Sequence, residues 1–244
     1  MIFGIGVVLM RSAGCVMNDI ADRDFDPHVA RTRDRPLAAG DLTLSDALLV
    51  FFILMIAAFG LVLLTNPLTI QLAFVGALLA STYPFFKRFT HWPQVVLGVA
   101  FGWGVVMAFA AETSTVPAVA WALLAINTVW SVIYDTLYAM VDRDDDLEIG
   151  IKSTAILFAE HDLAALRALM IIMLLALIAL GINQGFTWPW FAAVLVCGLQ
   201  FARQQVWIKG RDRDACFRAF KDHNRVGLIL FLGLCAHYLW TSYG

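Results

Sequence analysis

Hydrophobic residues along this chain gather into eight runs, each bounded by polar or charged residues. In order, the runs are Ile2–Met17, Leu44–Leu64, Leu68–Phe86, Val95–Ala111, Val116–Met140, Leu163–Ile182, Trp188–Val206 and Val226–Trp240. A hydrocarbon core about 30 Å thick needs about 20 helical residues to cross it. Because lipid offers no partner for a backbone polar group, each run should cross as a helix. The pattern therefore predicts an all-α, polytopic membrane bundle of eight spans.

Composition agrees with this prediction and excludes other classes. Hydrophobic residues make up 61% of the 244 residues and charged residues 15%, against about 25% charged in ordinary soluble domains. The net charge of −2 comes without a basic tail, so we expect no nucleic-acid partner. The four cysteines form no close pair, which argues against a disulfide framework or a zinc site.

The basic residues indicate how the bundle is oriented. The loops after the second, fourth and sixth runs are Thr65–Pro67, Glu112–Val116 and Asn183–Thr187, and none contains Lys or Arg. All 17 Lys and Arg residues fall on the other side, which the positive-inside rule places in the cytoplasm. Acidic residues follow the same division except Glu112. Since the rule does not require acids there, they need an explanation of their own.

Two acidic motifs, four spans apart, supply that explanation. The first motif, residues 18–26, reads N-D-I-A-D-R-D-F-D, and the second, residues 134–146, reads Y-D-T-L-Y-A-M-V-D-R-D-D-D. Each begins at the cytoplasmic end of a span. Because an even number of spans separates them, both lie on the same membrane face and can meet across a central cavity. The equal offset between them suggests a duplicated four-helix unit, a common device in membrane proteins.

The spacing inside each motif favours converging oxygen ligands. Asp22 and Asp26 are four residues apart, as are Asp142 and Asp146, and Asn18 precedes Asp22 by four. On a continuing helix such residues share one face. Like charges held together repel one another, and a divalent cation removes that cost.

Carboxylate and amide oxygens suit Mg²⁺, which usually binds one or two carboxylates together with phosphate oxygens of a substrate. The sequence therefore predicts a magnesium-dependent site for a phosphate or diphosphate. The alternative is a pair of solvated acidic loops. A calcium EF-hand is excluded, because Leu147 stands where that loop needs Gly.

Cationic side chains accompany the acids. They are Arg31 and Arg35 after the first motif, Lys87 and Arg88 at the end of the third run, and Lys152 after the second motif. Such groups suit a diphosphate, since Arg binds its oxygens in pairs and Lys acts as a point charge. For Lys87 and Arg88 the alternative is simple anchoring on the positive side of the membrane.

Two ionisable residues lie within apolar runs, where they are functional candidates by default. Arg11 is one or two turns before Asn18 on nearly the same face, and it is suited to a substrate carboxylate; the alternative is a snorkelling side chain. Asp135 is suited to orient an Arg or to polarise an acceptor. The charge-dense stretch 203–225 is mixed in sign and is expected to be a solvated cytoplasmic loop.

These motifs resemble those of the UbiA superfamily of membrane prenyltransferases, N-D-x-x-D-x-x-x-D and D-x-x-Y-A-x-x-x-D-x-x-x-D. The chain fills the first with Asn18, Asp19, Asp22 and Asp26, and the second with Asp135, Tyr138, Ala139, Asp142 and Asp146. Within the superfamily the chain is most similar to the bacterial polyprenyltransferases that act on 4-hydroxybenzoate. The matching stretches include 11–26, 35–37, 83–88, 93–103 and 134–158.

The resemblance implies a role for each matched residue. Asn18, Asp22, Asp26, Asp142 and Asp146 would hold two Mg²⁺ ions, and the same four aspartates with Asp135 would be catalytic. Arg31, Arg35, Tyr83, Lys87 and Lys152 would bind the diphosphate, while Arg11 and Tyr138 would bind the acceptor. The implied reaction transfers a polyprenyl group from its diphosphate to the ring of 4-hydroxybenzoate, ortho to the hydroxyl, in ubiquinone biosynthesis.

The resemblance also bears on domain organisation and rivals. The family has nine helices around a central cavity, so this chain is expected to be one membrane-embedded domain that lacks the family's first helix, through truncation or a misassigned start. Ile2–Met17 is also short for a span and has no basic signal-peptide segment before it. A transporter is the alternative from another class; prenyl transfer to a menaquinone, haem or chlorophyll precursor is the alternative within the superfamily.

Overall fold

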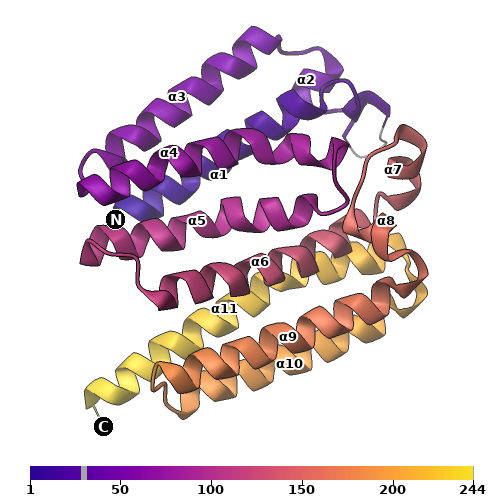
Figure 1. Cartoon of the computed structure of the whole chain (residues 1–244). Coiled ribbons are helices and arrows are strands. Elements are labelled where there is room, and N and C mark those ends of the chain that lie inside the picture. Colours follow the sequence, from indigo (N-terminus) through magenta and orange to yellow (C-terminus); the bar gives the residue numbers. More distant parts are fainter. Residues whose placement is uncertain (29–31, 244) are drawn as a thin grey trace. The chain divides into compact units, whose positions relative to one another are not determined.

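The computed structural model describes residues 1–28 and 32–243, and every regular element in this part of the chain is a helix (Figure 1). The elements are α1 (Ile2–Asp22), η1 (Asp26–His28), α2 (Pro36–Ala39), α3 (Leu44–Val62), α4 (Pro67–Thr82), η2 (Tyr83–Arg88), α5 (Pro93–Thr113), α6 (Ala118–Ala139), α7 (Arg143–Ile149), α8 (Thr154–Phe158), η3 (Ala159–His161), α9 (Asp162–Asn183), α10 (Trp188–Trp207), η4 (Ile208–Gly210) and α11 (Arg213–Tyr243). The predicted fold class is confirmed.

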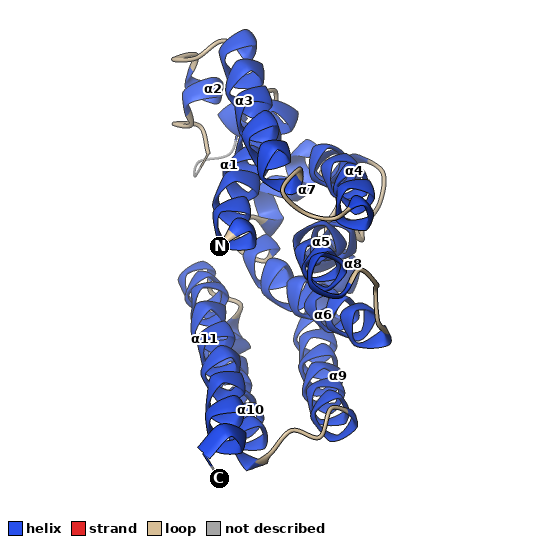
Figure 2. Ribbon diagram, turned by 90° about the vertical axis from the view of Figure 1, so that its left-hand side faces the viewer, coloured by secondary structure: helices blue, strands red, loops and turns tan. Residues whose placement is uncertain are grey.

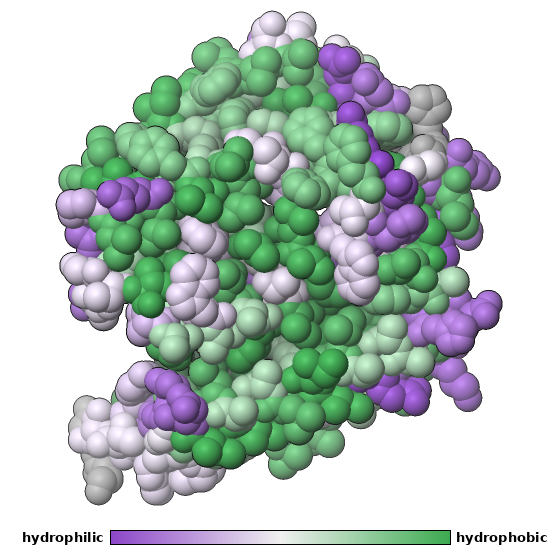
Figure 3. Space-filling model, viewed as in Figure 1, coloured by the Kyte–Doolittle hydropathy of each residue, from purple (hydrophilic) through white to green (hydrophobic). Residues whose placement is uncertain are grey.

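The predicted number of spans is confirmed as well. In the described part of the chain, eight helical segments are long and apolar enough to cross a membrane. Their outward sides carry large apolar side chains, which Figure 3 shows as hydrophobic surface along the helices. On α3 these include Leu49, Phe52 and Ile56, which are all exposed. Because only lipid can cover so much apolar surface favourably, the chain is a multi-pass membrane protein.

The helices form two compact units, which are described separately. The first unit contains Met1–Thr128 and Asp144–Lys152, and the second contains Val129–Arg143 and Ser153–Gly244. Helix α6 contributes its first half to one unit and its second half to the other. The predictions of one domain and of an internal four-helix repeat stay predictions.

In the first unit α1 packs against α3, and α4 packs against α5. Local sequence explains where these helices begin. Thr43 and Asp46 form a capping box at the start of α3, in which each side chain accepts the other residue's backbone N–H. Asn66 caps α4 by accepting from the Thr69 N–H at 2.9 Å, and its amide donates to the Ala110 carbonyl at 2.6 Å. One side chain therefore starts α4 and ties it to the end of α5.

In the second unit α10 packs along α11, and Figures 1 and 2 both show the two helices side by side. A methyl group added at Gly233 on α11 would lie 2.3 Å from the Ala193 Cβ on α10. Helix α9 joins this pair through Trp190, whose indole N–H donates to the Leu177 carbonyl at 3.1 Å. Small residues and buried tryptophan hydrogen bonds are common at helix contacts in membranes.

The stretch 203–225 is not the solvated loop that the charge pattern predicts. Helix α10 continues through Arg203 and Gln204, and α11 begins at Arg213. Asp222 on α11 is buried, pairs with Arg203 at 3.1 Å, and accepts from the Gln204 amide at 3.0 Å. The prediction was wrong because opposite charges on two facing helices neutralise one another, which lets the segment stay helical and packed.

The close approach of α10 and α11 gives a stability prediction. Gly233→Ala places a methyl group against Ala193 and forces the helices apart, so we expect a loss of about 1–3 kcal/mol of unfolding free energy. Thermal unfolding in detergent measures the change. Gly198→Ala on α10 is the matched control, because its added Cβ would meet only the Leu174 side chain, at an ordinary 3.5 Å. Equal melting temperatures for both variants would contradict the prediction.

Candidate functional site

The first motif lies where α1 ends. Asp22 is the last residue of the helix, and the Phe25 N–H donates to the Asp22 carbonyl at 2.8 Å, which turns the chain into η1 and Asp26. The helix therefore does not continue through the motif, and the prediction of one shared helix face was wrong for Asp26. Both side chains are nevertheless buried, with exposed fractions of 4% for Asp22 and 5% for Asp26.

Each buried carboxylate of the first motif has a cationic partner. Lys87 Nζ, on η2, lies 2.5 Å from Asp22 Oδ1, and the Asn18 amide donates to Asp22 Oδ2 at 3.1 Å. Arg35 Nη1 lies 2.9 Å from Asp19 Oδ1 and 3.0 Å from Asp26 Oδ2. Asn18, Asp22, Asp26, Arg35 and Lys87 are thus brought together, and their roles as metal and diphosphate ligands stay predictions. Arg31 lies outside the described residues.

Burial governs the ionisation of Asp26. Removal from water raises the pKa of the Asp26 carboxyl above its ordinary value, and the negative charge of Asp22 raises it further. The positive charge of Arg35 and its hydrogen bond oppose this change without cancelling it. Asp26 therefore holds a proton more readily than a carboxyl in water, and a cation that binds it must compete with that proton.

The second motif also spans the end of a helix. Asp135 and Tyr138 belong to α6, which ends at Ala139, and Asp142 precedes α7, which carries Asp146. The prediction of a continuing helix was wrong between Ala139 and Arg143, but Asp142 directly precedes α7, so this break does not separate Asp142 from Asp146. Asp135, Tyr138 and Asp142 belong to the second unit and Asp146 to the first.

Residues 144–152 join the first motif's unit through a specific contact. The Lys152 N–H donates to the Lys87 carbonyl at 2.9 Å, and Lys152 Nζ lies 3.4 Å from the Phe89 carbonyl. The segment that carries Asp146 is consequently fastened to the end of η2. In Figure 1, α2 and α7 lie at the same end of the helices of this unit. Asp146 and Lys152 therefore lie on the side where Asp22 meets Lys87.

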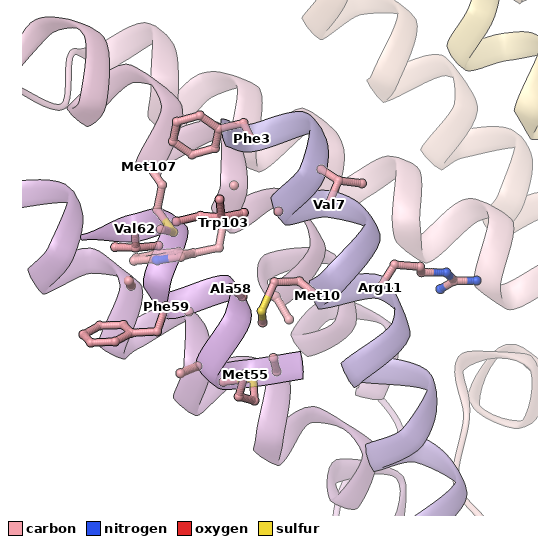
Figure 4. A pocket seen from close by; sticks show the side chains of 18 of the residues that line it. Phe3, Val7, Met10, Arg11, Met55, Ala58, Phe59, Val62, Trp103 and Met107 are labelled. Atoms are coloured by element: carbon pink, nitrogen blue, oxygen red, sulfur yellow. The ribbon is translucent and has the colours of Figure 1, made fainter. Parts of the chain in front are cut away.

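An apolar cavity of about 270 Å³ lies between α1, α3, α4 and α5. Figure 4 shows Met10, Met55 and Trp103 around it, whereas the Arg11 guanidinium extends away from Met10. Arg11 contributes to the lining, and its Cζ lies 5.5 Å from the centre of the Phe101 ring. Its lining residues include Thr69, near the start of α4, and Tyr83, just after the end of α4.

Tyr83 stands at the end of this cavity nearest Lys87. Its hydroxyl donates to the Gly14 carbonyl at 3.4 Å. The Tyr83 and Phe101 rings pack edge to face, with their centres 6.0 Å apart. Tyr138, in the second unit, packs against Phe220 with ring centres 4.8 Å apart and against Phe217 at 6.5 Å. Both tyrosines thus have aromatic neighbours, and their predicted roles in substrate binding stay predictions.

Two further residues belong to the first-motif cluster. Asp19 shares Arg35 with Asp26, and Arg88 donates to the Ala21 carbonyl at the end of α1. The Arg88 guanidinium also lies 5.1 Å from the centre of the Phe25 ring. The sequence left membrane anchoring open as the alternative role for Arg88. Phe25, an aromatic residue inside the acidic motif, is the sequence feature that could have indicated the contact with the Arg88 guanidinium.

The donor atoms of the first motif fit a hard divalent cation. Asp22 and Asp26 offer buried carboxylate oxygens beside the Asn18 amide, which is the ligand chemistry of Mg²⁺. Within residues 1–28 and 32–243, no group of three or more His, Cys, Asp or Glu side chains is arranged to hold a metal ion. Lys87 and Arg35 supply the positive charge beside the Asp22 and Asp26 carboxylates.

Comparisons with known proteins agree with the motifs. Residues 1–234 match the UbiA prenyltransferase family. The 4-hydroxybenzoate octaprenyltransferase of Psychromonas ingrahamii is 54% identical over 238 residues, which are 98% of this chain and 83% of that protein. The 4-hydroxybenzoate octaprenyltransferase of Enterobacter sp. (strain 638) is 53% identical over 240 residues, again 98% of this chain and 83% of the relative.

Two solved structures share the fold. The apo structure of a UbiA homolog from Aeropyrum pernix K1 has a TM-score of 0.83 and 27% identity, and the match covers 96% of this chain and 88% of that one. A UbiA homolog from Archaeoglobus fulgidus bound to GPP and Mg2+ has a TM-score of 0.71 and 15% identity, over 98% of this chain and 87% of that one.

The raised pKa of Asp26 predicts a pH effect on stability. A carboxyl that binds its proton more tightly in the folded than in the unfolded state gains unfolding free energy as the pH falls through the folded pKa. From pH 7 down toward the ordinary carboxyl pKa of about 3.9, wild type should therefore gain stability relative to Asp26→Asn. Thermal unfolding in detergent with a chelator measures this difference.

The matched control is Asp24→Asn, because Asp24 lies in the same turn with a 73% exposed side chain. The difference in melting temperature between wild type and Asp24→Asn should change much less over the same pH range. A pH dependence equal for the two variants would contradict the assignment of the raised pKa to the buried carboxyl.

Proposed function

Because this chain belongs to the UbiA prenyltransferase family, we propose that it transfers a polyprenyl group from its diphosphate to the ring of 4-hydroxybenzoate, ortho to the hydroxyl, in ubiquinone biosynthesis. The observation that carries this proposal is identity above 50% over nearly the whole chain to proteins named for 4-hydroxybenzoate. Both acidic motifs are intact within the matched residues. This level of identity also favours 4-hydroxybenzoate over the acceptors of other superfamily members.

The cofactor in this proposal is Mg²⁺. Asn18, Asp22 and Asp26 of the first motif and Asp142 and Asp146 of the second would hold it. When bound, the ion neutralises the diphosphate and stabilises it as a leaving group. Burial of Asp22 and Asp26 supports this role, because carboxylates kept from water interact more strongly with a cation than exposed ones do.

The cationic residues of the cluster would bind the diphosphate. Lys87 and Arg35 now neutralise Asp22 and Asp26. When a divalent cation takes the carboxylates, these two side chains become available for phosphate oxygens of opposite charge. Arg31, Tyr83 and Lys152 are the further candidates for this role. Arg31 and Lys152 follow the two motifs in the chain, and Tyr83 stands on η2 with Lys87.

The reaction then needs little covalent participation by the protein. The allylic C–O bond breaks and its electron pair leaves with the diphosphate, while the ring carbon ortho to the phenol supplies the pair for the new C–C bond. The proton on that ring carbon is lost afterwards. Asp135 and Tyr138, on α6, are the proposed acceptor-side residues. The protein holds the two substrates with their reacting carbons close together and correctly oriented, and it keeps water from the electron-poor allylic carbon.

The apolar cavity of the first unit suits part of the prenyl chain. Its lining runs from Tyr83, at the end of α4, to Thr65, just before the start of that helix. Phe59 and Trp103 line it between these ends. An isoprenoid chain has no polar group to satisfy, so a long apolar channel beside the diphosphate cluster is the environment that it requires.

The structure also bears on the transporter alternative. A transporter would be expected to carry its acidic residues near the middle of the membrane on helices broken within their spans. Here Asp22 and Asp142 lie at helix ends, and long spans such as α5 and α9 are continuous. This arrangement favours chemistry at one membrane face over transport through the bilayer.

We further propose that the protein resides in the bacterial cytoplasmic membrane, in contact with lipid, with its active site on the cytoplasmic side. The distribution of Lys and Arg supports this orientation, since the three loops on the opposite side lack them. Polyprenyl diphosphate would enter from the lipid and 4-hydroxybenzoate from water.

The central prediction concerns the aspartates. In membranes supplied with 4-hydroxybenzoate and a polyprenyl diphosphate, wild type should form product only with Mg²⁺. Asp22→Ala and Asp142→Ala should each lower kcat/KM by about 10²–10³-fold or more, as expected when a group that stabilises transition-state charge is removed. Radiolabelled 4-hydroxybenzoate extracted into organic solvent measures the product. Asp24→Ala, in the exposed turn, should keep near-normal activity.

Different outcomes would test the acceptor, the metal site and the enzymatic function separately. Product with other aromatic acceptors but not with 4-hydroxybenzoate would overturn the acceptor while keeping prenyl transfer. Magnesium-independent product, or full activity in both aspartate variants, would overturn the metal site. No product with any acceptor from well-folded protein would overturn the enzymatic function and favour transport.

Arg11 is predicted to recognise the acceptor carboxylate. Arg11→Met should raise the KM for 4-hydroxybenzoate by about 10- to 100-fold, because a hydrogen bond to a charged group contributes about 1.5–3 kcal/mol. The KM for the prenyl diphosphate should stay the same. The uncharged analogue 4-hydroxybenzamide is the control, since wild type and variant should bind it equally. An unchanged KM for 4-hydroxybenzoate would contradict this role.

A further inference from the structure

A fully buried carboxylate lies in the second unit, away from the motifs in sequence. Asp162 is the first residue of α9, and its exposed fraction is 0%. The Arg211 Nε donates to both of its oxygens, at 3.0 and 3.1 Å, and the Leu163 N–H donates to Oδ1 at 2.6 Å. Arg143 donates to Oδ2. Asp162 thus has three donors, two of them arginines from distant parts of the chain.

The first of these arginines is part of the second motif. Arg143 follows Asp142 directly, so its ion pair with Asp162 fixes the chain immediately beyond that aspartate. A second buried contact fixes the chain before it. The hydroxyls of Thr136 on α6 and Thr154 on α8 lie 2.5 Å apart, and both side chains are buried. The segment 136–143, which carries Tyr138 and Asp142, is therefore held at both ends by residues of the chain that follows.

The second arginine completes a rigid support. Arg211 also donates to the Glu160 carbonyl at 2.8 Å, and the hydrogen bond that Arg211 donates to Asp162 raises the pKa of its guanidinium. Arg211 and Ala159 both have positive φ, of 56° and 46°, which residues with a side chain rarely adopt. Such conformations persist where surrounding contacts over-determine them. The turn before Asp162 and the turn that carries Arg211 are thus fastened to each other through Asp162 and the Glu160 carbonyl.

We propose that Asp162 is a positioning residue for the second motif: through Arg143 it holds Asp142 in place to bind the metal–diphosphate complex. This inference rests on the proposed function. Groups that orient a metal ligand without touching the metal control its affinity, because they fix the ligand's direction before the ion arrives. Asp162 touches neither substrate nor ion and acts only through the segment that it anchors.

The second unit offers a matched control. Asp222 is also buried, with a 6% exposed fraction, and also pairs with two arginines, Arg203 at 3.1 Å and Arg225 at 3.2 Å. All of its described partners lie on α10 and α11, so it does not hold segment 136–143. Removing either charge takes a buried carboxylate away from its two arginine partners and should destabilise the protein. Only the loss at Asp162 should also affect the metal.

The experiment measures binding separately from turnover. Purified wild type, Asp162→Asn, Asp222→Asn and Arg143→Lys are titrated with Mn²⁺ in the presence of inorganic pyrophosphate, and free Mn²⁺ is followed by electron paramagnetic resonance. We expect Asp162→Asn to raise the dissociation constant about 10-fold or more, the loss typical of altered metal-supporting contacts. Asp222→Asn should also lower the melting temperature but leave the constant unchanged. Arg143→Lys, which keeps the positive charge, should raise it by a smaller factor.

Activity then separates this inference from the proposed function. In prenyl transfer, Asp162→Asn should require more Mg²⁺ and more prenyl diphosphate for half-maximal rate, with the KM for 4-hydroxybenzoate unchanged. Equal Mn²⁺ affinity in wild type and Asp162→Asn would overturn the inference. If Asp162→Asn does not fold, unchanged affinity in Arg143→Lys overturns it. If wild type binds Mn²⁺ but transfers no prenyl group, the proposed function fails while the positioning role is still decided by the titration.

Discussion

Carboxylates that leave water at a membrane boundary must be neutralised, and this requirement organises the charged ends of the helices. Asp22 meets Lys87, Asp26 meets Arg35, and Asp162 accepts from Arg143 and Arg211. A lone buried charge costs several kcal/mol, so each acid determines where a basic side chain from elsewhere in the chain must lie. The connections between spans follow these pairs: η2 comes to the end of α1, and the turn before α11 comes to the start of α9.

The same requirement explains why both motifs coincide with helix ends. If α1 continued past Asp22, the next acids would extend away from it along a solvated helix. Instead the turn after Asp22 folds Asp26 back to a site where Arg35 reaches it. The helix break therefore gives up a few backbone hydrogen bonds and gathers negative charge in a small volume, which is the arrangement that a polyvalent cation prefers.

Much of the fold could be predicted from sequence, because lipid allows few alternatives to a helix for a long apolar run. The eight spans, the short connections near Asn66 and Gln184, and the acidic motifs at one end of their helices all follow from hydropathy and spacing. The helical course of 203–225 could not be predicted, since the partners of Asp222 come from two different helices. Asp162 was missed for the same reason: its arginines stand 19 and 49 residues away.

The sharing of Arg35 has a kinetic consequence. Asp19 and Asp26 both pair with Arg35, and Asp22 pairs with Lys87. A divalent ion entering alone would displace Arg35 and Lys87 from carboxylates with which they are already paired. An ion that arrives already chelated to a diphosphate brings its own negative charge for those displaced cations. We therefore expect ordered kinetics in which metal and prenyl donor enter as one complex, and free magnesium by itself associates weakly.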